Sequence, residues 1–283
     1  MSTATREAPA VREDTRDAWN RIAPGYDRTN TPTQMWLANE GLRRAGLRRG
    51  MSFLDVAAGS GALSIPAARL GAQVLAIDQS PAMLELLRAR SRKEKLDIET
   101  RVMDGHALVL ADDQFDLAGS QFGVMLFADM PRGIREMARV VKPGGRVLMH
   151  VYGDPHEIDF LAFFVGALQS VRPEFSGPPM EPPPLPFQLQ DPARLRAELA
   201  AAGLKDVRVE SITETTGFRS GEELWDWIVC SNPVVGTVLG ELRLTPAEAS
   251  VARDTLARMA RERAAGGETA QLGNPIHIGI GTK

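Results

Sequence analysis

The 283-residue sequence has one cysteine, few aromatic side chains and no long apolar run. The single Cys230 cannot form an internal disulfide, and the first residues have neither the apolar core nor the cleavage pattern of a secretory signal. Both features are typical of a reducing compartment, so the sequence predicts a cytoplasmic protein. The longest apolar run, 160–168, is about half of the roughly 20 residues that cross a bilayer. We therefore expect no membrane-spanning segment.

An excess of charge of either sign is also lacking. The 33 Lys and Arg residues nearly balance the 36 Asp and Glu residues, which gives a formal net charge of −3. This balance argues against a nucleic acid or an anionic membrane surface as the partner. A small molecule is the expected partner. The length is sufficient to bury a large core, so size is no obstacle to an enzyme.

Strand and helix signals alternate through the first half of the chain. The spacing of apolar residues predicts strands at 52–56, 73–77, 98–102, 116–120 and 146–152, with helices at 62–70, 81–94 and 130–140 and a turn at 142–145. Ser80 before Pro81 and Asp191 before Pro192 each pair a capping side chain with a proline at the first helical position. The alternation predicts an α/β fold, with a parallel sheet covered by helices on both faces.

The rest of the chain departs from this alternation. The first dozen residues have the composition of a disordered tail, and short helices are predicted at 15–22 and 34–47 with a proline-containing loop between them. Seven prolines at 173–186 predict an extended segment. Thr245 and Glu248 form a capping box before an apolar stretch. Further elements are expected as helices at 192–202, 222–229 and 246–264 and strands at 207–213 and 275–280. We divide the chain into an N-terminal tail and helical cap (1–50), a core (51–152), a proline-rich insertion (153–190), a continuation of the core (191–219), a helical lid (220–270) and a last core strand (271–283).

A glycine-rich turn follows the first predicted strand, in Asp55-Val56-Ala57-Ala58-Gly59-Ser60-Gly61. Glycine lets the backbone pass close beneath a ligand, and free amides at a helix start can bind a carboxylate. Tight packing of a strand against a helix also requires glycine. The turn alone therefore fits a ligand site or a purely structural role.

Acidic residues also end the next two predicted strands. Asp78, about 20 residues after the turn, is placed to accept hydrogen bonds from both hydroxyls of a ribose, although it could instead cap the helix beside Ser80. Asp104, in Met103-Asp104-Gly105-His106, is placed to accept from an adenine amino group. Acids at three successive strand ends are hard to explain by turn chemistry, and they favour an adenosine site.

Ser64 stands where a dinucleotide fingerprint has its third glycine. A cofactor with a pyrophosphate is therefore disfavoured. Asp55 would repel phosphates but suits a ligand that carries an ammonium group. These features favour S-adenosylmethionine, with an NAD(P)-dependent oxidoreductase as the less favoured alternative.

Five motifs occur in the order found in class I S-adenosylmethionine-dependent methyltransferases, which this chain resembles. They are 55–61, Asp78, Asp104, Phe115-Asp116-Leu117 and Arg139-Val140-Val141-Lys142-Pro143-Gly144-Gly145. The resemblance implies a Rossmann-like, seven-stranded, mostly parallel sheet, with the last strand inserted antiparallel between those at 146–152 and 207–213. It also implies a set of cofactor-binding residues: Asp55, Ala57, Gly59 and Gly61 at the methionine part, Asp78, Gln79 and Met83 at the adenosine, Asp104, Gly105 and His106 near the adenine, and Gln121 or Phe122 facing the sulfonium.

The N-terminal region is similar to the opening of the ubiquinone and menaquinone biosynthesis methyltransferases, a type 11 methyltransferase group, in Ile22-Ala23-Pro24, Tyr26, Asp27 and Asn30. The end of the chain, at 279–283, is similar as well. This resemblance implies that Tyr26 lies over the cofactor. The segment 120–125 lacks the Gly-Arg-Asn pattern of the quinone enzymes, and the insertion at 220–268 is longer than theirs, so the acceptor stays open.

Methyl transfer from a sulfonium is an in-line displacement, so much of the acceleration can come from orientation alone. A general base is needed only where the acceptor loses a proton. Tyr152 and His156 are the candidates for this role, with His150, because they end or follow the fifth strand; a structural or solvated role is the alternative for each. No metal site is expected.

Aromatic residues gather in the two insertions, at Phe160, Phe163, Phe164, Phe175, Phe187, Trp225 and Trp227. Some should pack the lid onto the sheet, and the others should line an apolar pocket. We expect an enzyme that methylates a small, largely apolar acceptor, such as a quinone precursor or a secondary metabolite, and releases S-adenosylhomocysteine. The alternative is an enzyme of the same fold that retains the cofactor and catalyses a non-methylating reaction.

Overall fold

The computed structural model describes residues 15–177 and 180–283. Its seven-stranded sheet has the order β3-β2-β1-β4-β5-β7-β6. The strands are β1 (Ser52–Val56), β2 (Gln73–Asp78), β3 (Ile98–Val102), β4 (Phe115–Gln121), β5 (Val141–Tyr152), β6 (Lys205–Phe218) and β7 (Ala270–Thr282). β7 runs antiparallel between β5 and β6, and the other pairings are parallel. The predicted Rossmann-like sheet is therefore confirmed, including the inserted last strand.

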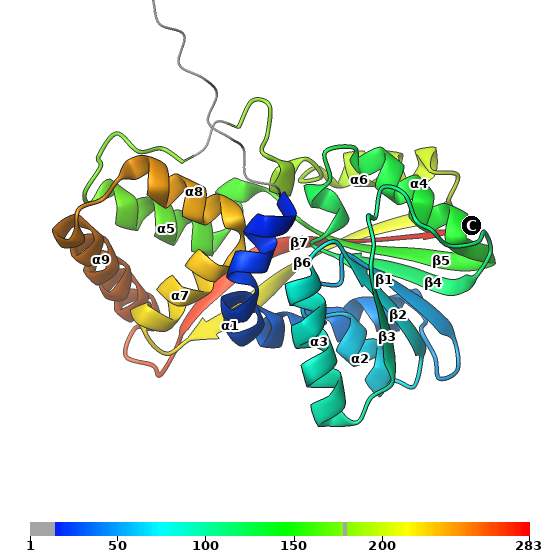
Figure 1. The fold of residues 1–283 in the computed structure, drawn as a ribbon. Helices are drawn as coiled ribbons and strands as arrows, with labels where there is room; N and C mark the ends of the chain where they lie inside the picture. Colours follow the sequence, from blue (N-terminus) through cyan, green and yellow to red (C-terminus); the bar gives the residue numbers. More distant parts are fainter. Residues whose placement is uncertain (1–14, 178–179) are drawn as a thin grey trace, which may run out of the picture.

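Helices cover both faces of this sheet. α1 (Thr15–Ala45), α2 (Ser64–Arg69) and α3 (Pro81–Glu94) lie on one face, and α4 (Met130–Val140) and α6 (Pro192–Ala201) lie on the other (Figure 1). The Ser80 hydroxyl accepts the Met83 N–H, and the Asp191 carboxylate accepts the Ala193 N–H, as the two capping signals predicted. The main hydrophobic core fills the space between the sheet and these helices.

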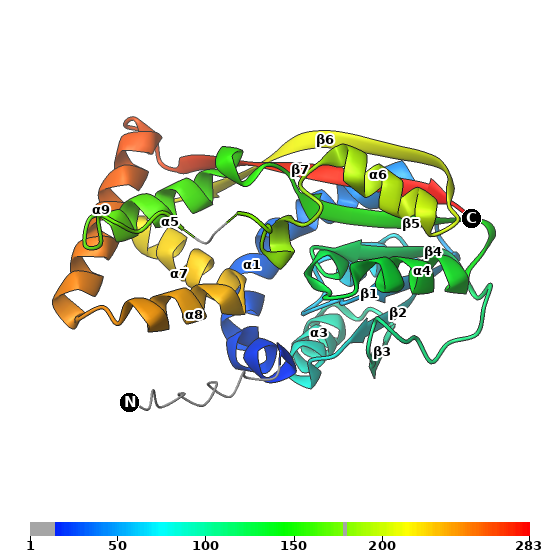
Figure 2. The ribbon, with the colours of Figure 1, turned by 90° about the horizontal axis from the view of Figure 1, so that it is seen from above.

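Four more helices gather at one end of the molecule. α5 (Asp159–Gln169), α7 (Gly221–Ser231), α8 (Pro233–Leu242) and α9 (Pro246–Ala264) surround the far end of the long β6–β7 pair, which Figure 2 shows extending from the sheet into this helical region. They share a second core that includes Phe160, Trp227 and Leu256. Short 3₁₀ helices η1 (Val124–Leu126), η2 (Pro155–Glu157) and η3 (Leu185–Phe187) lie in the connections. No helix in the described residues is long and apolar enough to cross a membrane.

The N-terminal helix differs most from the prediction. α1 is continuous through Pro24 and Pro32, so the predicted division into two helices with a loop between them is wrong. Each proline removes a backbone donor, which the local sequence signals correctly. Tertiary contacts override that signal, because the Asn30 side chain donates to the Trp227 carbonyl and the Thr31 hydroxyl hydrogen-bonds the Ser60 hydroxyl, both in buried surroundings.

Other boundaries also shift. The predicted turn at 142–145 lies within β5, which starts at Val141, and Gly144 adopts a φ of +80° there. β6 and β7 are both longer than predicted. α5 and α8 were not predicted, because their apolar sequences carry no local pattern that separates a short buried helix from other buried segments.

Candidate active site

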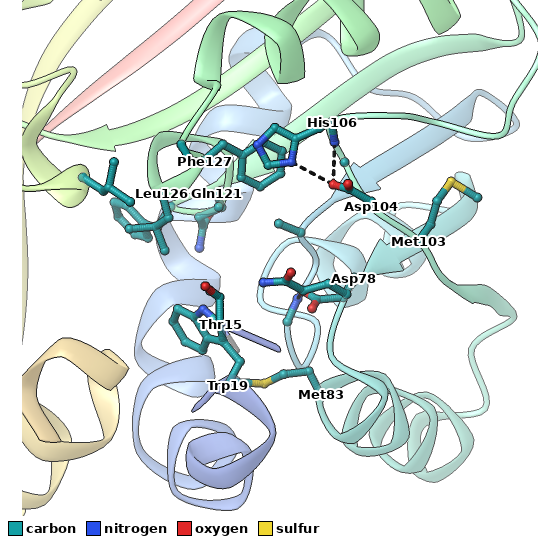
Figure 3. Close-up of a pocket in the computed structure, with 18 of the residues that line it drawn as sticks. Thr15, Trp19, Asp78, Met83, Met103, Asp104, His106, Gln121, Leu126 and Phe127 are labelled. Carbon is teal, nitrogen blue, oxygen red and sulfur yellow. Dashed lines mark hydrogen bonds and ion pairs between the residues drawn. The ribbon is translucent and has the colours of Figure 1, made fainter. Parts of the chain in front are cut away.

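A cavity of about 240 Å3 lies where β1, β2 and β4 end. β1 pairs with β2 on one side and with β4 on the other, so the order of the strands reverses at this point. Ligand sites in open α/β sheets form outside the carboxyl ends of the strands at such a reversal. Figure 3 shows side chains from these strand ends and from the start of α1 facing the cavity. The lining includes all of the predicted cofactor-binding residues except Asp55 and Gly61, namely Tyr26, Ala57, Gly59, Asp78, Gln79, Met83, Asp104, Gly105, His106, Gln121 and Phe122.

Asp55 and Gly61 are buried and do not line this cavity. Asp55 is buried, and its Oδ2 accepts a hydrogen bond of 2.5 Å from the Ser64 hydroxyl, while its Oδ1 has no partner among the described residues. Burial raises the pKa of Asp55 to about 7. At Gly61, with φ +101°, a Cβ would lie 3.0 Å from Leu87 Cγ, so glycine allows α3 to pack closely. Ser64 therefore donates a side-chain hydrogen bond to Asp55, which glycine cannot do.

Asp78 holds the glycine turn and borders the cavity, while the cap of α3 is Ser80 rather than Asp78. The Asp78 carboxylate accepts the backbone N–H groups of Gly59 and Ser80, each at 2.8 Å, and so fixes the glycine turn to the end of β2. Burial raises its pKa, and these backbone hydrogen bonds oppose the rise. The side chain also borders the cavity (Figure 3). Each carboxylate oxygen has a second lone pair, so Asp78 can accept from a ligand at the same time.

Two residues that are not glycine adopt left-handed backbone conformations at this site. Ala57 directly follows β1, Phe122 directly follows β4, and both have a φ of +57°. Such a conformation is costly for an ordinary residue and persists where surrounding structure imposes it. A Cβ on the neighbouring Gly123 would lie 2.5 Å from Ala57 Cβ, so the two turns approach as closely as their side chains allow. The strain is thus located in the wall of the cavity.

The far end of the cavity is flat and partly aromatic. The Asp104 carboxylate bonds the His106 backbone N–H at 2.9 Å and His106 Nδ1 at 2.8 Å, which Figure 3 marks with dashed lines. The His106 ring stacks on Phe127 with centroids 4.3 Å apart. Partial burial raises the pKa of Asp104, but the bonds from His106 outweigh that effect and lower it. An anionic acceptor beside a flat aromatic wall suits a heterocycle with an amino group.

Several lining residues were not predicted: Thr15, Trp19, Met103, Gly123, Leu126, Phe127, Ala128 and Leu185. Thr15 and Trp19 come from the first turns of α1, and Leu185 comes from η3. Only the tertiary fold brings these segments to the strand ends, so no local signal identifies them.

A second cavity of about 120 Å3 adjoins the first. Trp19, Tyr26, Phe122 and Leu126 border both cavities. The rest of its wall comes mainly from the helical region and η3, and includes Phe160, Phe164, Phe175, Phe187, Ile228 and Val238. None of the described residues in its lining is charged. It is therefore an apolar compartment that shares four wall residues with the strand-end cavity.

The three base candidates have different surroundings. Tyr152 lines the second cavity, and its ring stacks on Phe122 with centroids 4.5 Å apart. Burial raises the pKa of Tyr152 well above its usual value, so its hydroxyl keeps its proton. His156 lies outside both cavities, with 79% of its side chain exposed and Nδ1 2.8 Å from Asp154 Oδ1. This placement gives no support to His156 as a base.

His150 is buried in the core beneath α1. Its Nδ1 lies 2.8 Å from Gln121 Oε1, and its Nε2 has no partner among the described residues. Burial lowers its pKa to about 3, so the ring is neutral and only weakly basic. A structural role for His150 therefore fits best.

A buried carboxyl group that the sequence did not single out is Glu214 on β6. Its side chain is 4% exposed, burial raises its pKa to about 7, and its Oε1 has no partner among the described residues. The predicted strand ended at residue 213, so Glu214 fell outside it. Had the predicted strand been extended by one residue, Glu214 would have shared a face with Ile212. A charged side chain on an inward face is unusual, and this signal could have singled out Glu214.

Comparisons with known proteins agree with this arrangement. Residues 54–149 match the family model described as a methyltransferase domain. A stretch of 103 residues, 36% of this chain, is 41% identical to an uncharacterized protein of Mycobacterium tuberculosis and covers 38% of that protein. A stretch of 145 residues, 50% of this chain, is 36% identical to the demethylmenaquinone methyltransferase of Tropheryma whipplei and covers 59% of it. The matched stretches thus span less than two thirds of these relatives.

The fold is also found in solved structures. Phosphoethanolamine N-methyltransferase 2 of Haemonchus contortus superposes with a TM-score of 0.58 at 18% identity, over 96% of this chain and 60% of that one. Sheet order, motif order and family match together define the class: this is a protein with the class I methyltransferase fold. More particularly, residues 54–149 match the methyltransferase-domain family, and the five motifs of the sequence lie in or beside this stretch.

Proposed function

We propose that the chain is an S-adenosylmethionine-dependent methyltransferase that acts on a small, largely apolar acceptor. The observation that carries this proposal is the pair of adjoining cavities. One is bordered by the glycine turn and the acids at the strand ends, and the other is apolar and uncharged. The family match of residues 54–149 and the similarity to demethylmenaquinone methyltransferase support it.

The first cavity offers partners for each part of the cofactor. Asp78 would hold the ribose, Asp104 would accept from the adenine amino group, and the unpartnered Oδ1 of Asp55 beneath the turn would attract the ammonium group. When bound, S-adenosylmethionine supplies a methyl group on a positively charged sulfur. Gln121 and Phe122 line the first cavity, and Phe122 also borders the second. The sulfur should therefore lie beside these two residues.

The second cavity would orient the acceptor and exclude water. Its wall joins residues of the segments 153–190 and 220–270, which we assign to the acceptor side of the enzyme. Burying a charge in this apolar space would be costly, so the buried part of the acceptor should be neutral. Tyr26 lies at the junction of the two cavities, since it borders both. Its hydroxyl donates to Gln34 Oε1 at 3.0 Å, which fixes the side chain there. Holding the acceptor against the junction supplies the near-attack geometry of an in-line displacement. A quinone precursor or a secondary metabolite fits these requirements.

Isothermal titration calorimetry with S-adenosylhomocysteine tests the cofactor half of the proposal. We expect saturable binding to the unaltered protein and at least about tenfold weaker binding to Asp78→Asn, which loses a charge-assisted acceptor. Asp97→Asn, on the exposed side chain before β3 at the other end of the sheet, is the matched control and should bind normally. Tight binding of NADH without a response to S-adenosylmethionine or S-adenosylhomocysteine would instead favour the oxidoreductase.

The methyl-transfer half needs a separate experiment. The protein is incubated with a deuterated-methyl cofactor and extracted metabolites, and the products are analysed by mass spectrometry. Appearance of the labelled methyl group in a small apolar product is the expected result. Cofactor binding together with a changed metabolite that lacks the label would favour the cofactor-retaining, non-methylating alternative.

A further inference from the structure

Two buried polar side chains face each other on the sheet beside the second cavity. Glu214 of β6 and Asn274 of β7 are directly opposite in the antiparallel register, so their side chains share one face of the sheet. They are 4% and 2% exposed. Glu214 Oε1 and Asn274 Oδ1 both lack a partner among the described residues. While Glu214 is ionised, both atoms are acceptors and cannot satisfy each other, so a hydrogen-bond donor is required between or beside them.

Tyr152 is a candidate donor that also borders the second cavity. On the other side of β7 it is opposite Ile276, two residues from Asn274 and on the same face. Tyr152 and Asn274 are thus diagonal neighbours on adjacent strands, a separation that aromatic side chains can reach. Glu214 is on the same face, one strand further along the sheet. No hydrogen bond joins the Tyr152 hydroxyl to the described residues. After burial, the charge of Glu214 is the next cause that raises the pKa of Tyr152, so the carboxyl group lies near this ring.

Helix α1 closes this space from above. A Cβ on Gly41 would lie 1.9 Å from Nε2 of His150, two residues before Tyr152 on the same face, so α1 packs directly on β5. The helix presents Tyr26, Asn30 and Gln34 at intervals of four, on one side. The Tyr26 hydroxyl is already occupied by Gln34. Of the two tyrosines that border the second cavity, Tyr152 therefore has the uncommitted hydroxyl.

We propose that, once the acceptor is bound, the Tyr152 hydroxyl turns to donate to Glu214, a contact that the described residues do not make without ligand. Glu214 is then a positioning residue that directs the lone pairs of the Tyr152 oxygen toward a hydroxyl-bearing acceptor. The inference rests on the function proposed above and narrows the acceptor to a neutral phenol, quinol or other alcohol. During transfer the acceptor oxygen bonds the methyl carbon as the carbon–sulfur bond breaks and its electron pair stays on sulfur. The acceptor proton passes to the Tyr152 oxygen, and the Tyr152 proton passes to the Glu214 carboxylate.

The protonation state of Glu214 should govern this contact. Its titratable neighbours are Tyr26 from α1 and Tyr152 from β5, which both stay neutral because burial raises their pKa values above the usual value. Asn274 of β7 is uncharged, and burial is the sole cause that sets the pKa of Glu214, at about 7. Above about pH 7 the Glu214 carboxylate can accept the hydrogen bond from Tyr152. Below that pH the carboxyl group is protonated and becomes a donor itself, so it no longer favours the Tyr152 hydroxyl as its donor.

Binding of two naphthalenes to the protein loaded with S-adenosylhomocysteine tests the inference. The probes are 2-naphthol, which carries a hydroxyl donor, and 2-methoxynaphthalene, which has the same rings and no donor. We expect the unaltered protein to prefer 2-naphthol by roughly tenfold at about pH 8.5 and much less at about pH 5.5. Glu214→Gln should make the preference independent of pH, and Tyr152→Phe should abolish it at each pH.

Glu210→Gln is the matched control, since Glu210 lies on the same strand and face but is exposed and paired with Arg44. It should behave as the unaltered protein does. A pH-dependent preference that survives in Glu214→Gln would overturn the inference, as would failure of both probes to bind the loaded protein. Loss of S-adenosylhomocysteine binding by the unaltered protein is a different result, because it contradicts the proposed function itself. Tyr152→Phe keeps the inference testable should Glu214→Gln not fold.

Discussion

At the scale of single residues, the strain at Ala57 gives a testable effect on stability. Its φ of +57° puts a side chain where glycine is comfortable. Ala57→Gly should therefore raise the free energy of unfolding by about 1 kcal/mol, offset in part by the greater freedom of glycine in the unfolded chain. The adjacent buried Ala58 has no such φ, so Ala58→Gly is the control and should destabilise the protein by about 1 kcal/mol. Urea denaturation measures both; a loss of stability in both variants would show that Ala57 is not strained.

Asp55 should make the stability of the ligand-free protein depend on pH. Burial raises its pKa from 3.8 to about 7, so the folded protein retains a proton that the unfolded chain releases between these values. The contribution of Asp55 is thus fully present below about pH 4 and is lost as the pH rises to about 7, a change on the order of 4 kcal/mol at most.

Asp55→Asn removes this titration. The variant should gain a few kcal/mol of stability over the unaltered protein at about pH 8 and little at about pH 4. Chemical denaturation at the two pH values measures the difference, with Asp97→Asn as the exposed control. Equal pH slopes in the variant and the unaltered protein would be incompatible with a buried, proton-retaining Asp55. The same substitution should weaken S-adenosylhomocysteine binding, because the ammonium group loses its carboxylate.

At the scale of elements, two helical glycines should respond oppositely to alanine. In α1, a Cβ on Gly41 would lie 1.9 Å from His150 Nε2, so Gly41→Ala should push the helix off β5 and cost about 1–3 kcal/mol. In α8, a Cβ on Gly236 would meet nothing within 4 Å, so Gly236→Ala should stabilise the helix by about 0.5–1 kcal/mol. Thermal unfolding separates the two. Because α1 carries Tyr26, Gly41→Ala should also weaken S-adenosylhomocysteine binding. Unchanged thermal stability of Gly41→Ala would mean that α1 does not pack against His150.

The elements that the sequence predicts well are those whose ends carry local chemistry. α3, α4 and α9 have the predicted bounds, because a capping residue and a proline mark the start of each. The strand-end acids and the glycine turn were also recognisable, since motif spacing encodes them. α1 was not, because contacts with Trp227 and Ser60, far away in the sequence, hold it together. The burial of Glu214 and the parts of the cavity walls that come from α8 and η3 also result from long-range packing, so the sequence does not reveal them.

At the scale of the whole molecule, the candidate site lies between two cores of different character. The main core fixes the strand ends, whereas the second core holds α5, α7 and α9 around the β6–β7 extension (Figure 2). α8 has no buried residue, yet Val234, Val235 and Val238 from it line the second cavity. A wall that is weakly packed on its outer side can open for an acceptor while the cofactor side stays rigid.

Hydrogen–deuterium exchange tests this division. Without ligand, α8 should exchange much faster than β4 and β5, because few apolar contacts protect its hydrogen bonds. S-Adenosylhomocysteine should slow exchange at the start of α1 and in the turns after β1 and β4, which line the first cavity, and should leave α6 on the opposite face unchanged. Adding 2-naphthol should then slow α8. Equally slow exchange in α8 and β5 before any ligand is added would show a rigid acceptor wall, and the acceptor would then have to enter past η3 instead.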